Sequence, residues 1–228
     1  MTFLELCQTV RLEVGVSGTG PSTVVGQEGQ LKSIIDYVAE ADHQIQGLWK
    51  DWNFLWGQYS STLSTGTSAP ALNKPTDLGT WDMRSFFLDY TADDYTNLTP
   101  LSYVDYRSSQ RQGTQTDSTP TYVIVQPDES IIVYPNPEKT YTIAADYWKT
   151  PTRMSANADV SSIPTQYHRI IVCRAKAFWA EREEAPEILL SSSAEYSDLL
   201  DKLEAQSLPD QRLRRLSSVD TNEVIQVI

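Results

Sequence analysis

A chain of 228 residues can bury a core as one large domain or two small ones, and a composition of 40% hydrophobic and 21% charged residues is typical of a globular protein. The 30 acidic and 18 basic residues give a net charge of −12, which disfavours tight binding to nucleic acid because neutralising phosphates requires a basic patch. No apolar run approaches the roughly 18 residues of a membrane span, and "MTFLELCQTV" lacks the basic start of a signal peptide, so we expect no membrane partner.

Two helices are predicted at the start of the chain. Apolar residues recur at helical spacing over 2–14, with Thr2 as the N-cap, and again over about 28–54. At 1.5 Å per residue the second helix would be roughly 40 Å long.

The stretch between these helices, "GVSGTGPSTVVGQ", comes within one residue of the phosphate-binding pattern G-x-x-x-x-G-K-[ST]. However, Pro21 stands where that pattern has its lysine, and a helix rather than a strand precedes the loop. We therefore interpret Gly15, Gly18, Gly20 and Pro21 as a structural corner whose glycines supply positive φ angles.

The middle of the chain is predicted to be β structure. Residues 57–80 are rich in Ser, Thr, Gly and Pro and are interpreted as a linker, and residues 81–150 as an inserted antiparallel β domain. The segments that resemble strands are "TWDMRSFFLDY", "LSYVDYRSS", "TYVIVQ", "SIIVYP" and "TYTIAADYW". We expect the last three to form a meander with a turn at Pro127-Asp128, and a polar loop at 108–120 to project from it.

Helical periodicity returns at about 163, with Pro164 in the first turn; this helix runs to about 184, and Pro186 separates it from a helix that reaches about 206. Neither helix pair can bury its apolar stripe alone. We therefore expect an α+β fold in which the N-terminal helices (1–56) and the C-terminal helices (151–208) form one small bundle. The β domain is inserted into it, and an extended tail occupies 209–228.

Catalytic and metal-binding patterns are weak. The residues that could serve are His43, His168, Cys7, Cys173 and an acidic turn with Asp89, Asp93 and Asp94. Both cysteines lie in apolar helical patterns and are expected to be buried, and the carboxylate spacing matches no calcium loop. We predict a protein that is not an enzyme and has no cofactor or metal.

Two groups of residues are candidates for interaction. The aromatic group Trp49, Trp52, Phe54, Trp56 and Tyr59 belongs either to the bundle core or to a seam between subunits, and we expect some of it to meet another chain. The tail is either a frayed terminus or an arm that docks on the portal, where it would add a strand or fill a groove. Its basic and apolar residues are Arg212, Arg214, Arg215, Val224, Ile225, Val227 and Ile228.

The N-terminal third, "MTFLELCQTVRLEVGVSGTGPSTVVGQEGQLKSIIDYVAEADHQIQ" followed by "DWNFLW", resembles the opening of head-to-tail adaptor proteins of tailed bacteriophages, especially short-tailed ones. These proteins are portal-binding rings, also called connector or head-completion proteins. The resemblance covers about 55 of the 228 residues. One departure is "ADHQ" (Ala41 to Gln44), where a bulky residue is expected, so packing there should differ.

The resemblance implies a structural virion protein, assembled in the host cytoplasm. It would form a twelve-fold ring below the portal, extend the DNA channel and present a platform for tail, nozzle or fibre proteins. A negative charge spread along the whole chain suits a channel that passes DNA without gripping it. The alternative is a receptor- or carbohydrate-binding tail component that uses the aromatics of the β domain, and an enzyme ranks third.

Overall fold

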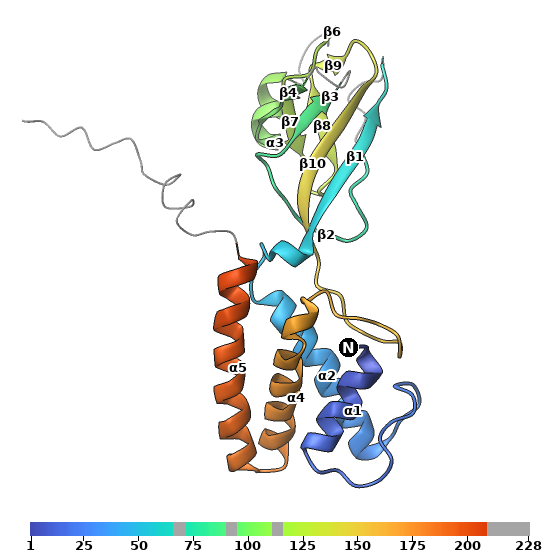
Figure 1. Cartoon of the computed structure of the whole chain (residues 1–228). Helices are drawn as coiled ribbons and strands as arrows, with labels where there is room; N and C mark the ends of the chain where they lie inside the picture. Colours follow the sequence, from blue (N-terminus) through green and yellow to red (C-terminus); the bar gives the residue numbers. More distant parts are fainter. Residues whose placement is uncertain (66–71, 90–94, 111–115, 209–228) are drawn as a thin grey trace, which may run out of the picture. The chain divides into compact units, whose positions relative to one another are not determined.

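The computed structural model describes residues 1–65, 72–89, 95–110 and 116–208, and in them the fold is mixed α+β, as predicted. The chain divides into two compact units (Figure 1). The bundle unit consists of residues 1–55 and 151–208, and the β unit of residues 56–150. The tail at 209–228 lies outside the described residues.

Four helices form the bundle unit: α1 (Phe3–Glu13), α2 (Gly29–Gly47), α4 (Arg169–Arg182) and α5 (Pro186–Ser207). Helix α4 packs against α1, α2 and α5 (Figure 1). It therefore buries residues on several faces: Ile170, Ile171, Val172, Cys173, Ala175, Ala177 and Ala180. The predicted bundle of an N-terminal and a C-terminal helix pair is confirmed.

Local signals at the helix ends explain where the helices start. The N-cap Thr2 forms a reciprocal capping box with Glu5, whose carboxylate accepts from the Thr2 N–H at 2.8 Å. Pro186 is not merely a break between helices, because it occupies the first turn of α5, where its missing N–H leaves no bond unmade.

Two helix boundaries differ from the prediction. Helix α2 ends at Gly47 rather than near 54, and a 3-10 turn at Asn53–Leu55 follows, because the fully buried Trp52 folds back and donates its indole N–H to the Ile45 carbonyl at 3.2 Å. Helix α4 begins at Arg169 rather than 163, because the buried His168 ring bonds the carbonyl of Ile163 and holds the preceding turn.

The larger sheet of the β unit is built around β10 (Tyr141–Lys149). This strand pairs antiparallel with β1 (Trp56–Leu63), β2 (Leu78–Trp81) and β3 (Phe87–Asp89), and β3 pairs with β4 (Tyr95–Asn97). These strands, the segments next to them and the hairpin at 122–134 together bury one apolar cluster: Leu63, Leu72, Leu78, Trp81, Phe86, Leu88, Leu98, Val123, Ile131, Val133, Tyr141, Ile143, Ala145 and Tyr147.

A smaller sheet joins the predicted hairpin of β7 (Tyr122–Val125) and β8 (Ile131–Tyr134) to the short parallel strand β5 (Thr99–Pro100). The turn of the hairpin has Glu129 at a φ of 67°, which follows Pro127-Asp128 as predicted. Two further short strands, β6 (Asp117–Ser118) and β9 (Asn136–Pro137), pair in parallel.

Three expectations for the β unit are wrong. Residues 57–80 are not simply a linker, because β1 and the start of β2 lie there; the Ser- and Thr-rich β1 alternates exposed and buried positions. The segment "LSYVDYRSS" is helical: α3 (Tyr103–Asp105) and a π turn (Tyr106–Gln110) follow the N-cap Ser102. Among the described strands the expected three-stranded meander is absent, because β10 does not pair with β8 but with β1, β2 and β3.

Candidate functional site

The glycine-rich corner between α1 and α2 is held by side chains from elsewhere in the bundle unit. Gly15 and Gly18 have φ angles of 72° and 104°, which L residues rarely adopt. Gly20 does not have the positive φ angle that we predicted, but a Cβ there would lie 3.3 Å from the Arg11 side chain, so this position also suits glycine. The amide of Gln8 donates to the Pro21 carbonyl at 2.9 Å.

The aromatic group that the sequence singles out is divided between inside and outside. Trp52 is fully buried, and Phe54 stacks on it with ring centroids 5.0 Å apart. Tyr59 packs edge-on against Trp81 inside the β unit. These three rings therefore serve packing within the chain.

Trp49 and Trp56 are the exposed members of the group, at 43% and 47% of their surface. The indole N–H of Trp49 donates to Glu204 Oε1 at 2.9 Å, which fixes the ring against the last turns of α5. The neighbouring Leu48 is also 47% exposed, so an apolar pair lies at the surface of the bundle unit. Exposed, immobilised Trp side chains of this kind are common centres of protein interfaces.

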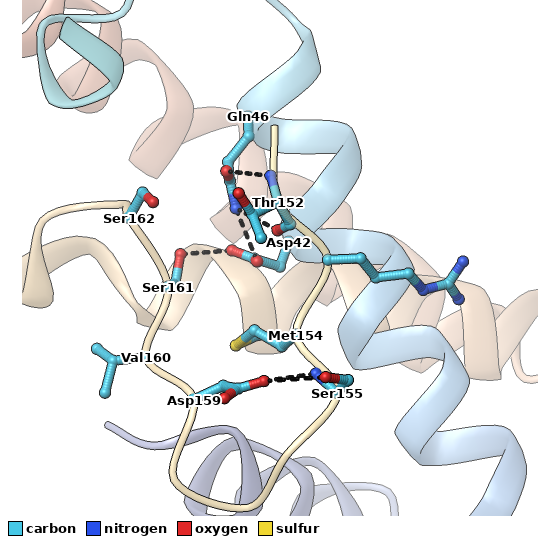
Figure 2. A pocket seen from close by; sticks show the side chains of 10 residues that line it. Asp42, Gln46, Thr152, Met154, Ser155, Asp159, Val160, Ser161 and Ser162 are labelled. Carbon is cyan, nitrogen blue, oxygen red and sulfur yellow. Dashed lines mark hydrogen bonds between the residues drawn. The ribbon is translucent and has the colours of Figure 1, made fainter. Parts of the chain in front are cut away.

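The segment 151–163, which we call the strap, carries the chain into the bundle unit and encloses a cleft of about 330 Å³ (Figure 2). Figure 2 shows Asp42 and Gln46 projecting from α2 toward the strap. The hydroxyl of Ser161 donates to Asp42 Oδ1 at 2.5 Å, and the Gln46 amide donates to Asp42 Oδ2 at 2.8 Å. Gln46 also accepts from the Thr152 N–H at 3.3 Å.

The carboxyl group of Asp42 is fully buried, as is unusual for an aspartate without a bonded cation. Burial raises the pKa of Asp42 above its ordinary value, because it disfavours the charged form, and the hydrogen bonds from Ser161 and Gln46 only partly oppose this. Asp42 belongs to the "ADHQ" departure, where different packing was expected. A polar network joining α2 to the strap occupies that place.

The strap is also fastened to α1 and to the corner. Asn157 Oδ1 accepts from the Val24 N–H at 2.7 Å, and the Asp159 carbonyl accepts from the Phe3 N–H at 2.7 Å. The Asp159 carboxylate accepts from the backbone N–H groups of Ala156 and Ser155, which lower its pKa. Sequence reasoning missed these residues; the run of Asn, Asp and Ser in "SANADVSS" was the available signal.

An ion-pair network joins α1, α4 and α5 on the bundle surface. Arg169 bonds Glu13 and, at 2.8 Å, Glu195, and Lys176 lies 2.9 Å from Glu13. Partial burial opposes ionisation of Glu13, but hydrogen bonds from the two basic residues lower its pKa. For Glu195, the bond from Arg169 is the main cause of a lowered pKa. Ion pairs among these four side chains therefore link α1, α4 and α5.

Among the other sequence candidates, Cys7, Cys173 and His168 are buried. Burial raises the pKa of both Cys7 and Cys173 to about 12, so their thiols are protonated at neutral pH. Burial also lowers the pKa of His168, whose Nε2 lies 2.9 Å from the Ile163 carbonyl. His43 is exposed on α2.

In the acidic turn, Asp89 ends β3, whereas Asp93 and Asp94 lie outside the described residues, as do all seven residues proposed for the tail. Among the residues that the structure describes, no group of three or more His, Cys, Asp or Glu could hold a metal ion. None of the helices in the described ranges is long and apolar enough to cross a membrane.

Comparison with protein families gives one clear match. A family model described as "SU10 adaptor protein" matches residues 1–221, so the similarity runs through both units and beyond α5. A comparison with curated proteins finds no match.

Proposed function

The chain belongs to the SU10 adaptor protein family, and on that premise we propose that it forms a ring adaptor that joins the portal to the tail and extends the DNA channel. The family makes it a structural adaptor of a bacteriophage and a component of the virion. The observation that carries the proposal is the extent of the family match, which includes the β unit and is not confined to the N-terminal helices.

A closed ring needs two different complementary faces on each subunit, since its contacts are head-to-tail. The surface formed by Leu48 and Trp49, next to the end of α5, is the candidate for one of these faces. Its indole is already bound to Glu204, so little conformational entropy is lost when a neighbour covers it. The ring is proposed to be twelve-fold, as in the adaptors that the sequence resembles.

Passage of DNA through such a ring requires weak contact with the phosphates. The net charge of −12 opposes phosphate binding through like-charge repulsion. Several basic side chains of the described residues are also engaged with carboxylates, as Arg169 and Lys176 are with Glu13. The charge distribution therefore supports a channel or platform that passes DNA without holding it.

Native mass spectrometry of the full-length chain, alone and mixed with its cognate portal, tests the proposal. We expect a ring on the portal, and we expect Trp49→Ala to weaken ring formation while Val104→Ala, at another exposed apolar residue, leaves it unchanged. A full-length chain that ignores the portal at micromolar concentration would refute the adaptor function.

A second candidate, receptor or carbohydrate binding by the β unit, is favoured by one observation. Tyr122 is 37% exposed beside Tyr134, with ring centroids 6.5 Å apart, and such rings can stack on sugars. Glycan binding by the full-length chain, lost in Tyr122→Ala, would support this function in place of the ring adaptor.

A further inference from the structure

Strand β1 is a long edge strand of the larger sheet. All eight of its residues pair with β10, from Trp56 opposite Trp148 to Leu63 opposite Tyr141, without a register shift. In the described ranges no strand pairs with its other side, because β1 ends the strand order β1-β10-β3-β4. A row of backbone donors and acceptors therefore faces outward along β1.

The residues that supply this row follow from the contacts of Asp146 in β10. Its carbonyl accepts from the Asp82 N–H at 3.0 Å, and its N–H donates to Ser85 Oγ at 2.7 Å, so both groups point away from β1. Successive residues of a strand direct their backbone groups to opposite sides, so the neighbours of Asp146 bond β1 instead. Gln58, the partner of Asp146, and Ser60, two residues on, therefore direct their N–H and C=O groups to the open edge.

This edge lacks the features that usually protect an edge strand. The sequence "WGQYSSTL" contains no charge and no proline, and the side chains of Gln58, Ser60 and Thr62 are exposed. At the opposite end of the sheet, β4 has only three residues. A long, neutral and regular edge is a template for an added strand.

The chain itself contains a matching segment in the twenty residues that follow the described structure. Residues 223–228, "EVIQVI", are β-branched at four of six positions, as is typical of strands. Residues 209–222 form a spacer of fourteen residues, which extended could span about 46 Å. The sequence therefore supplies both a strand-like segment and a stretch of chain that separates it from α5.

We propose that residues Glu223–Ile228 of a neighbouring copy add a strand to the open edge of β1. The choice of a neighbour rests on the proposed adaptor function, in which copies assemble head-to-tail through two different surfaces. The edge of β1 and the tail segment are two such surfaces. Backbone bonds supply most of the attraction, and the β-branched side chains favour the extended conformation.

Mixed cross-linking tests the pairing and its source. One chain carries Ser60→Cys and another carries Ile225→Cys, and a bis-maleimide is used whose reach covers a two-residue register step, about 7 Å. The native thiols do not compete, because both are buried with a pKa of about 12. We expect a cross-linked pair with one copy of each variant. A chain that carries both substitutions is the control. Cross-linking only within this single chain, or none at all, would overturn the proposal.

A matched pair of variants tests the bonding. Ser60→Pro removes an N–H that faces the open edge but none that bonds β10, whereas Ser60→Ala keeps it. We expect Ser60→Pro to weaken self-association by about tenfold and Ser60→Ala to leave it unchanged, at unaltered circular dichroism. If Ser60→Pro alters the circular dichroism, the substitution has disturbed the fold, and the mixed cross-linking experiment then tests the proposal.

Deletion of residues 223–228 separates this inference from the adaptor function. We expect the shortened chain to lose more self-association than Ser60→Pro does, because the whole added strand is absent. If it still self-associates normally but no longer binds the portal, the segment docks on the portal; the inference is then wrong and the adaptor function stands.

Discussion

Ser161→Ala is predicted to destabilise the bundle unit more than an ordinary surface substitution. The side chain donates to the buried Asp42 at 2.5 Å and accepts from the Ile163 N–H at 3.1 Å, and only 8% of the residue is exposed. A hydrogen bond to a charged group contributes about 1.5–3 kcal/mol, and an N–H left unpaired costs about 1 kcal/mol or more. We expect the free energy of unfolding to fall by about 3 kcal/mol.

A double-mutant cycle with Asp42→Asn isolates the charged part of this effect. In the Asp42→Asn background the hydroxyl bonds a neutral amide, so Ser161→Ala should cost only about 2 kcal/mol, a coupling of about 1 kcal/mol. Urea denaturation followed by far-ultraviolet circular dichroism reports on the bundle unit, where the four long helices lie. Equal costs in both backgrounds would refute the reasoning that an ionised Asp42 is held by Ser161.

The difference in free energy of unfolding between the parent chain and Asp42→Asn is predicted to depend on pH. Because burial raises the folded-state pKa of Asp42 above its unfolded value, the folded state binds the proton more tightly. Stability therefore falls as pH rises from the unfolded pKa, near 4, through the raised folded pKa. Asp42→Asn should exceed the parent chain in free energy of unfolding at pH 7, and the difference should vanish near pH 4. An advantage that persists in acid would contradict this assignment.

Three further predictions use urea denaturation, followed by far-ultraviolet circular dichroism for substitutions in the bundle unit and by near-ultraviolet circular dichroism, which reports on aromatic packing, for the substitution in the β unit. Trp52→Ala removes a fully buried ring and should cost about 3–5 kcal/mol; a loss below 1 kcal/mol would show that this site is not core. Glu13→Gln should cost about 1 kcal/mol at neutral pH; since its folded pKa is lowered, this advantage of the parent should disappear as pH falls below about 4. Gly57→Ala places a Cβ 2.9 Å from the Tyr147 ring and should cost about 1–3 kcal/mol in the β unit, whereas Gly47→Ala meets nothing within 4 Å and should be neutral or slightly stabilising.

The helices were predictable because their signals are local. Periodic apolar residues and the Thr2 N-cap define α1, and its capping box needs only residues three apart. The end of α2 was not predictable in this way, because Trp52 continues the apolar pattern while its ring turns back to bond Ile45. A tertiary contact therefore overrides the periodicity.

Strand β1 was missed because its inner face is only weakly apolar. Its buried positions are Gly57 and Leu63, and the half-buried ones between them are Tyr59 and Ser61. Gly57 is there because the Tyr147 ring leaves no room for a Cβ, a reason that depends on a residue ninety positions away. A strand that uses small residues for close packing has the composition of a linker, so composition alone leads to the wrong prediction.

The buried carboxylate could be predicted in part. Asp42 lies four residues after Val38 and three before Ile45, so it falls on the apolar stripe of α2, where a carboxylate needs a partner. The sequence cannot identify that partner, because Ser161 is 119 residues away on a segment without periodicity. The sequence alone shows that Asp42 is unusual at this position, but only the tertiary structure shows the hydrogen bonds around it.

The β unit interrupts the sequence of the helical bundle between Leu55 and Pro151. The ladder between β1 and β10 places Trp56 opposite Trp148, so the two ends of the inserted segment lie beside each other. An insertion whose ends meet leaves the host core closed. On the bundle side, the outgoing chain is anchored by the buried Trp52 and the returning strap by the bond of Ser161 to Asp42. Because the outgoing and the returning chain are each fixed in the bundle core, α4 can pack on α1 and α2 although 121 residues separate α2 from α4.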